Sequence, residues 1–434
     1  VATSSADALK VPDIRDRISW MFIGFAIFAL CVHIPIPGID RVTWDKLASG
    51  DLLQFLGMFT GGALTKFSIV ALGITPYINA SIIMQLMTVV VPSLKEEQKE
   101  GGEIGRRRIA RITRNLTIGL ACLQATMMTI SLSKYHGQNG EEIFLSNSPV
   151  FLATVIVTLV AGTCFMLWLG ETLTERSLGN GVSLIIFAGI VMSYPKYLMQ
   201  TFEQAHAGGP KAVIAVIIFF LICLGIIASI IFMTMGVRKV PIQYPKRQVG
   251  NKMYGGQNTF LPVKVNNAGV ISIIFAVSIM YLPTTLAGFI PADAVGVAGA
   301  YKNIVNLYLN PNNHFYNLLY ALCVVFFTFF YSAIAFNVED IADNLKKAGG
   351  FIPGIRPGRP TAEYLERLVT RLNVISGAYL AFLAVAPTYV MRLTNVTSFY
   401  LGSTSLLIIV GVALDTMQQI EARLVLRHYQ GFMK

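Results

Sequence analysis

The side chains of this sequence best suited to nucleophilic, redox or metal chemistry are its five cysteines. All five lie inside apolar stretches, and none stands at the short Cys or His spacing that a structural zinc site requires. They are Cys31, Cys122, Cys164, Cys223 and Cys323. The pattern predicts small packing residues, and neither a metal site nor a cofactor is expected.

Acidic and basic side chains are nearly absent from the same apolar stretches. Ion-coupled pumps and intramembrane proteases need such groups at membrane depth. The few titratable residues near these stretches stand at their ends, at His33, Glu171, Glu175 and Asp415. Each is expected to be interfacial, and a passive conduit fits the sequence better than an enzyme or a proton-driven pump.

The elements that carry these residues are long uncharged segments. Of the 434 residues, 54% are hydrophobic and 13% are charged, whereas soluble domains have about 25% charged residues. A helix needs about 20 mostly apolar residues to cross the hydrocarbon of a membrane. The sequence offers ten such candidates, at residues 18–39, 67–94, 112–133, 150–169, 177–195, 212–235, 268–290, 315–337, 372–391 and 396–414. The expected fold is therefore an all-α polytopic membrane protein.

Basic residues divide unevenly between the segments that connect these spans. With the N-terminus in the cytoplasm, 26 of the 34 Lys and Arg residues fall on the cytoplasmic side, as the positive-inside rule requires. Both termini are then expected in the cytoplasm, and no cleavable signal peptide is expected at the first span. Two halves, residues 1–200 and 201–434, would be inverted, which places a pathway at their interface. Ten helices without internal symmetry fit the pattern equally well.

The second candidate span is preceded by a segment that cannot cross. Residues 52–66 contain Lys66 and the pair Gly61 and Gly62, so they are too polar and broken to face lipid. Composition favours an interfacial helix, and burial among neighbouring helices is the alternative.

The span that follows has two distinct faces. Ile74, Ile78 and Ile82 share one face. Ser81, Gln85 and Thr88 form a polar line on another, which must meet protein, water or a passing substrate. Spacing alone favours hydrogen bonding between helices.

Two basic loops, residues 236–266 and 337–371, face the cytoplasm under this topology. Prolines and the pair Gly255 and Gly256 predict an extended, turn-rich or hairpin structure in the first, and not a helix. The second has a Gly/Pro-rich turn with the basic residues Lys346, Lys347, Arg356 and Arg359. Topology explains the sign of this charge, but such loops could also meet anionic lipid, RNA phosphate or an acidic protein.

Several stretches of the sequence are more specific than composition and spacing. They are IPIPGID (34–40), FTGGAL (59–64), LGITPYINASIIMQL (72–86), EGGEIGRRRIARITR (100–114), MLWLGETLTERSLGNGVSLIIFAGIV (166–191), YPKRQVGNKMYGGQNTFLPVKVNNAGV (244–270), ADNLKKAGGFIPGIRPGRPTAEYL (342–365) and FYLGSTSLLIIVGVALD (399–415). In this order they resemble bacterial sequences of the SecY family, the central pore-forming subunit of the protein translocase. The resemblance covers nearly the whole chain.

The resemblance implies an hourglass pore between two inverted five-helix halves. The matching positions of its aliphatic ring are Ile74, Ile78, Val182, Ile186, Ile274 and Ile408. Val182 stands where isoleucine is frequent, which should loosen the ring slightly. The resemblance also makes the segment from about residue 52 to 67 a plug, with Leu52, Phe55, Met58, Phe59, Gly61, Gly62 and Leu64.

Two further surfaces come from the resemblance. A lateral gate, which would let an apolar signal sequence enter lipid, is implied at Asn79, Ile82, Gln85, Gln124, Asn266 and Ser278. A docking surface for the ribosome and the SecA motor ATPase is implied at Arg238, Lys239, Lys246, Arg247, Lys252 and Arg356. Asn251 and Lys252 stand where relatives often carry two arginines, so affinity for these partners should differ.

The expected function is a protein-conducting channel subunit without enzymatic activity in the bacterial inner membrane. It would move unfolded secretory polypeptides outward and release transmembrane segments sideways. The implied partners are SecE and SecG, SecA, the ribosome, signal sequences, nascent secretory polypeptides and membrane lipids. Because the sequence has no GxxxxGK[ST] phosphate loop, nucleotide hydrolysis must come from a partner. The alternatives are a secondary transporter of a small solute and a membrane scaffold or insertase without a pore.

Overall fold

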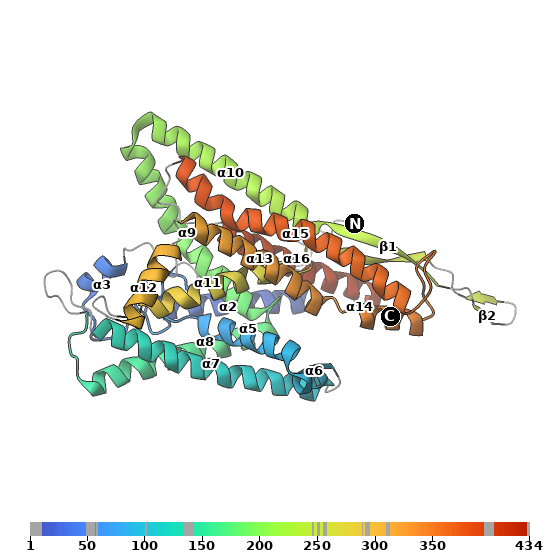
Figure 1. The fold of residues 1–434 in the computed structure, drawn as a ribbon, viewed down its shortest axis with the longest axis horizontal. Helices are drawn as coiled ribbons and strands as arrows, with labels where there is room; N and C mark the ends of the chain where they lie inside the picture. Colours follow the sequence, from blue (N-terminus) through green and yellow to red (C-terminus); the bar gives the residue numbers. More distant parts are fainter. Residues whose placement is uncertain are drawn as a thin grey trace.

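The protein is a bundle of long helices with a β ribbon projecting from one end (Figure 1). The computed structural model describes residues 11–48, 57, 60–99, 102–133, 143–244, 247–249, 252–254, 258–288, 290, 296–309, 313–394 and 403–431. The helices are α2 (Pro12–His33), α3 (Arg41–Ala48), α5 (Thr75–Val90), α6 (Pro92–Lys99), α7 (Gly102–Ser133), α8 (Pro149–Arg176), α9 (Gly181–Ala207), α10 (Gly209–Met235), α11 (Ile271–Gly288), α12 (Val297–Tyr308), α13 (His314–Ala335), α14 (Val338–Lys347), α15 (Arg359–Thr394) and α16 (Ser403–Gly431). The strands are β1 (Val237–Gln243), β2 (Arg247–Val249), β3 (Lys252–Tyr254) and β4 (Asn258–Lys264).

The length and composition of these helices suit a membrane. Eight helical stretches of the described chain are long and apolar enough to span one, and two shorter apolar helices lie at Thr75–Val90 and Ile271–Met280. Their outward faces are rich in large apolar side chains, as on α10, where Ile217, Leu221 and Leu224 are exposed. The prediction of an all-α polytopic membrane protein is confirmed.

Several helix starts are fixed by side-chain caps. The Ser148 hydroxyl accepts a hydrogen bond from the Phe151 N–H at 3.3 Å, and Pro149 then occupies the first position of α8. Asn180 accepts from the N–H groups of Val182 and Ser183 at the start of α9. Such caps satisfy backbone donors that the first turn leaves without partners.

The bundle has two different ends (Figure 1). The basic end carries the strands β1 to β4 together with α6 and α14, and the far end carries α3 and α12. Arg423 near the end of α16 pairs with Asp13 at the start of α2, at 3.5 Å. Gln418 of α16 accepts from Lys264 of the ribbon at 3.2 Å. The first and last helices therefore both meet the basic end.

The bounds of two expected segments were wrong. The span expected at 67–94 is α5 alone, because residues 67–74 form turns around Gly73, whose φ is +56°, and Pro92 starts a separate helix. The expected loop 337–371 contains α14 and the first turns of α15, which leaves the N-cap Asn337 and residues 348–358 outside a helix. The expected division between residues 200 and 201 falls inside α9, and the two inverted halves stay a prediction.

Candidate functional site

Four helices bring their first turns together in one apolar cluster. Among its members are all six aliphatic residues singled out in the sequence, which are Ile74 and Ile78 of α5, Val182 and Ile186 of α9, Ile274 of α11 and Ile408 of α16. We call these six the collar cluster. Each stands at the N-cap or within the first two turns of its helix.

The collar cluster lies between the two ends of the bundle. The residues that lead into α5 are bonded to the far end of α2, since Ile69 N donates to Ile34 O at 3.0 Å. The turn that leads into α9 is held at the basic end, where Arg17 donates to Ser177 O at 3.2 Å. Helices entering from opposite ends therefore meet at this level.

Two glycines allow α9 to pack closely against α8 beside the collar cluster. A Cβ on Gly181 would lie 2.0 Å from the carbonyl oxygen of Gly170, so the start of α9 can approach α8 only without a side chain there. The Cβ position of Gly170 is 3.4 Å from Val182 and 3.5 Å from Ile74. Close backbone packing thus presses two members of the collar cluster against the same point of α8.

The segment 60–74 is buried among the helices beside this cluster. Ala63, Phe67, Ser68 and Val70 are buried. Ile36 N donates to Phe67 O at 3.1 Å, which with the bond from Ile69 forms a short antiparallel bridge to the chain after α2. Of the two interpretations for this segment, its described part therefore favours burial over an interfacial helix.

An aromatic contact holds the middle of this segment. The Trp44 indole N–H donates to Thr65 O at 2.8 Å, and its ring lies 4.7 Å from that of Phe67 in an edge-on arrangement. Phe67 has a φ of +45°, which a bulky side chain adopts only when the surroundings impose it. Trp44 thus fixes the backbone of the segment against α3.

The expected plug residues divide at the limit of the described chain. Leu52, Phe55, Met58 and Phe59 lie outside the described residues. Gly61, Gly62 and Leu64 lie inside them; a Cβ on Gly61 would be 3.0 Å from the Cα of Gly189 and 3.3 Å from the Phe28 ring. The described end of the expected plug therefore touches α9 and α2.

A basic contact lies at the far end beside the same segment. Lys66 Nζ is 2.8 Å from His33 Nε2 at the end of α2. Partial burial lowers the pKa of Lys66, and the neighbouring charge of Lys196 lowers it further. This contact adds a second link between the segment and α2.

The residues expected at a lateral gate are only partly brought together. Ile82 of α5 packs in one apolar cluster with Ile273, Phe275 and Met280 of α11, so these two helices do meet. The Gln85 amide donates to the Ser81 hydroxyl of its own helix at 3.2 Å, while its carbonyl oxygen is buried without a partner in the described structure.

The remaining gate candidates are polar and lie on α5, α7, α11 and the turn before α11. Asn79 is buried on α5, and Gln124 and Ser278 are half-buried on α7 and α11. Asn266 accepts from the Gly269 N–H at 2.9 Å and so shapes the turn before α11. Ile82 is placed by its packing at the contact of α5 with α11.

The two basic loops form one body at the basic end. β1 pairs antiparallel with β4 and β2 with β3, so of the structures expected for the first loop the hairpin is the one observed. Gln243 of the ribbon exchanges backbone hydrogen bonds with Phe351, at 2.9 and 3.0 Å. Val240, Val263, Ile352 and Leu365 form the apolar core beneath. We call the ribbon and residues 348–358 the basic platform.

The basic platform displays several of the expected docking residues. Arg238, Lys239 and Arg356 are exposed, and the ammonium of Lys239 lies 4.8 Å from the Phe260 ring centre. The backbone of Arg247 and Lys252 lies in β2 and β3, while Lys246 falls outside the described residues. Cationic side chains therefore project from a rigid base.

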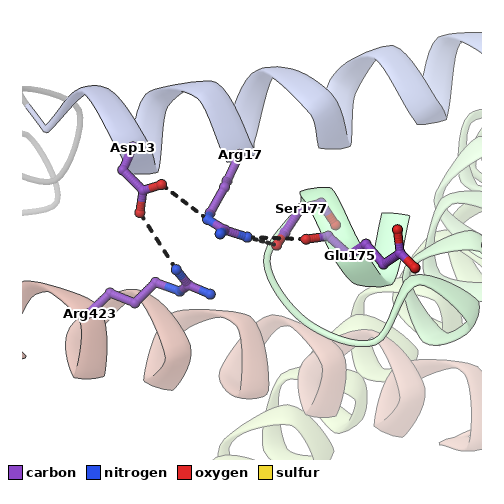
Figure 2. A network of polar contacts seen from close by, with 5 residues as sticks. All are labelled: Asp13, Arg17, Glu175, Ser177 and Arg423. Atoms are coloured by element: carbon purple, nitrogen blue, oxygen red, sulfur yellow. Dashed lines mark hydrogen bonds and ion pairs between the residues drawn. The ribbon is translucent and has the colours of Figure 1, made fainter. Parts of the chain in front are cut away.

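A polar network that sequence reasoning did not single out joins the first and last helices (Figure 2). Asp13 lies 3.4 Å from Arg17 on its own helix and 3.5 Å from Arg423. Arg17 also donates to the carbonyl oxygens of Glu175 and Ser177, at 3.4 and 3.2 Å. We call this network the terminal clasp. Ile14 and Leu178 are buried nearby.

Comparison with known proteins gives consistent results along the chain. A family model described as SecY matches residues 68–417. The protein translocase subunit SecY of Escherichia coli strain K12 is 41% identical over 425 residues, which cover 97% of this chain and 94% of that protein. SecY of Thermotoga maritima is 40% identical over 438 residues, which cover 99% and 97%. SecY of Rickettsia typhi is 43% identical over 428 residues, which cover 97% and 96%.

Solved structures share the fold. One described as a protein-conducting channel has a TM-score of 0.68 at 17% identity, with 97% of both chains covered. Sec61 in a canine ribosome–channel complex has a TM-score of 0.62 at 17% identity, again with 97% of both chains covered. These likenesses concern the path of the backbone.

Proposed function

The chain belongs to the SecY family, and we propose on that premise that it is the protein-conducting channel subunit of a translocase. The observation that carries the proposal is the collar cluster, whose six aliphatic side chains from the starts of four helices belong to one apolar cluster between the ends of the bundle. A channel for polypeptides performs no bond chemistry, which agrees with spans nearly free of titratable groups. The chain is a channel and not an enzyme.

The collar would act as a hydrophobic constriction. A narrow ring of aliphatic side chains holds water poorly, so ions that need hydration cross it at high cost. Aliphatic contacts have no directionality, and each pair of atoms contributes only about 0.1–0.2 kcal/mol. The ring can therefore part around an extended polypeptide and close again behind it.

Residues 60–67 are proposed as the described end of the plug that the resemblance places at about residues 52–67. Gly61 touches α2 and α9. The first two turns of α9 supply Val182 and Ile186 to the collar. Bonds of Phe67 and Ile69 to residues 34–36 hold the later part of this segment.

Release into lipid is proposed at the contact of α5 with α11. The packing of Ile82 against α11 is apolar, so lipid or an apolar signal sequence can replace it at little cost. Asn79, Gln85, Gln124, Asn266 and Ser278 would line the opened seam. The buried Gln85 carbonyl would find partners in a passing polypeptide.

The basic platform is proposed as the docking site for the SecA motor and the ribosome. Its exposed Arg238, Lys239 and Arg356 suit acidic protein surfaces and RNA phosphate. Sec61 occurs in a ribosome complex, which supports a ribosomal partner. SecE and SecG are proposed as companion subunits. The basic end would face the cytoplasm of a bacterium, with both termini on that side of the inner membrane.

The test is reconstitution of the chain with its companion subunits in vesicles. Addition of SecA, ATP and an unfolded secretory precursor should place the precursor beyond the reach of external protease, and omission of ATP should abolish this protection. Uptake of a small solute driven by an ion gradient, without protected precursor, would establish a transporter instead. Deletion of residues 52–66 should raise ion conductance, whereas a scaffold without a pore would show no change.

A further inference from the structure

α12 has three different faces. With 3.6 residues per turn, Val305 falls on a face that packs on the protein, and it is only 4% exposed. Asn303 and Asn306 fall on a second, exposed polar face. The third face is apolar and open, with Val297, Ile304 and Leu307 exposed by 90%, 57% and 63%.

This helix is firmly attached to the spans on either side. The Lys302 ammonium donates to Ile290 O at 2.7 Å, and the Tyr301 hydroxyl donates to Pro283 O of α11 at 3.0 Å. At its other end, the Asn313 amide donates to Leu307 O at 2.8 Å, just before α13 begins. The open apolar face is therefore held in a fixed orientation.

The open face continues the outer surface of a span. The Tyr308 ring lies 5.6 Å from the Phe315 ring at the start of α13. From Phe315, an exposed apolar stripe at helical spacing runs along α13 through Leu318, Leu322 and Phe326. Because α13 is a candidate membrane span, whatever covers this stripe also reaches α12.

The position of α12 in the bundle indicates the membrane depth at which it would lie. It lies at the far end of the bundle, across the direction of the long helices (Figure 1). A helix with one apolar and one polar face at the end of a span is suited to the boundary between lipid headgroups and acyl chains, where its apolar face is buried about 5–10 Å deep. The other far-end helix, α3, differs, since Trp44 is buried and Arg41 and Asp45 are exposed.

We propose that α12 is an interfacial membrane helix whose Val297, Ile304 and Leu307 side chains insert into the lipid leaflet at the far end of the bundle. Its bonds to Pro283 and Ile290 tie it to the end of α11, so the leaflet holds the outer end of that helix. This assignment concerns a lipid contact and does not depend on what the chain transports.

Spin labels can test this placement. The chain, with its five native cysteines replaced by alanine, receives one nitroxide at a time through Ile304→Cys or Leu307→Cys. Asn303→Cys and Asn306→Cys on the same helix are matched controls, and Val305→Cys reports a protein-covered position. Collision rates with oxygen, which concentrates in lipid, and with a water-soluble nickel chelate are measured in vesicles.

The ratio of oxygen to nickel collisions should be several-fold higher at positions 304 and 307 than at 303 and 306. Equal ratios at all four positions would place the apolar face in water and overturn the proposal. Low collision rates with both reagents at 304 and 307, as at 305, would show a protein partner or a second copy on this face and overturn it too.

A second measurement covers the case in which the cysteine replacements prevent folding. Leu307→Trp and Asn306→Trp are then made in the unaltered chain and compared in vesicles with brominated lipid. After subtraction of the fluorescence of the unaltered chain, quenching should be several-fold stronger for position 307. Equal quenching at both positions would contradict a lipid contact.

Discussion

At the scale of single residues, the six positions that the family resemblance singled out belong to one apolar cluster in the structure. Residues from position 74 to position 408 converge in one apolar cluster. Periodicity alone placed Ile74 and Ile78 on a common face of α5. It gave no reason to join them with Val182 or Ile408, because contacts between distant segments leave no mark in local spacing.

The collar predicts an effect of shortening one member. Ile78→Gly should raise ion leak through the reconstituted channel several-fold, because it removes the side chain that excludes water. Glycine also costs about 1 kcal/mol in helix propensity. Ile83→Gly carries the same cost at an exposed position of α5 and should leave the leak unchanged. An equal leak in both variants would attribute the effect to α5 and not to the collar.

At the scale of elements, turns and caps decide where the sequence-based expectation failed. Hydropathy located the spans because the hydrocarbon demands long apolar helices. It placed too much in the second span, because residues 67–74 are apolar yet form turns. It also took 337–371 for a loop, although Asn337 caps α14 and Lys346 and Lys347 stabilise its end.

The aromatic attachment of segment 60–74 predicts a local change in stability. Trp44→Phe removes the hydrogen bond to Thr65 O and keeps a ring beside Phe67. The loss of about 1 kcal/mol should speed hydrogen exchange of amides 63–70 about fivefold. Trp168→Phe, at an exposed ring, is the control and should not change this exchange. Unchanged protection in Trp44→Phe would show that the bond does not hold the segment.

The basic platform predicts a change in motor coupling. Arg356→Glu should lower SecA-driven translocation several-fold, because it reverses an exposed charge while leaving intact the bond from Thr361 to the Arg356 carbonyl. Arg392→Glu makes the same change near the far end of α15 and should preserve translocation. Membrane levels of both variants are measured in parallel. A matching loss of membrane level for Arg356→Glu would indicate a folding defect instead.

At the scale of the whole molecule, the terminal clasp joins the first helix to the last (Figure 2). Nothing in the local sequence pattern indicates this network, because basic residues at span ends are common and Asp13 and Arg423 are far apart in the chain. Exposed ion pairs contribute about 0–1 kcal/mol. Arg17 differs, since it also donates hydrogen bonds to the carbonyl oxygens of Glu175 and Ser177.

The clasp predicts unequal effects of its two arginines. Arg17→Ala should lower the thermal unfolding midpoint more than Arg423→Ala does, because it leaves a carbonyl of the buried Ser177 without its donor. Arg15→Ala, at an exposed position of α2, should have little effect. The Arg423→Ala effect should shrink in high salt, which screens exposed pairs. Equal shifts for the two variants in low salt would contradict this ranking.

The orientation of the helices around the collar has an electrostatic consequence. Every member of the collar cluster comes from the beginning of its helix and none from an end. The first turn of a helix carries roughly half an elementary positive charge from its aligned peptide dipoles. In the proposed collar, four such turns would surround an apolar ring. We therefore expect the barrier to be higher for a sodium ion than for a chloride ion.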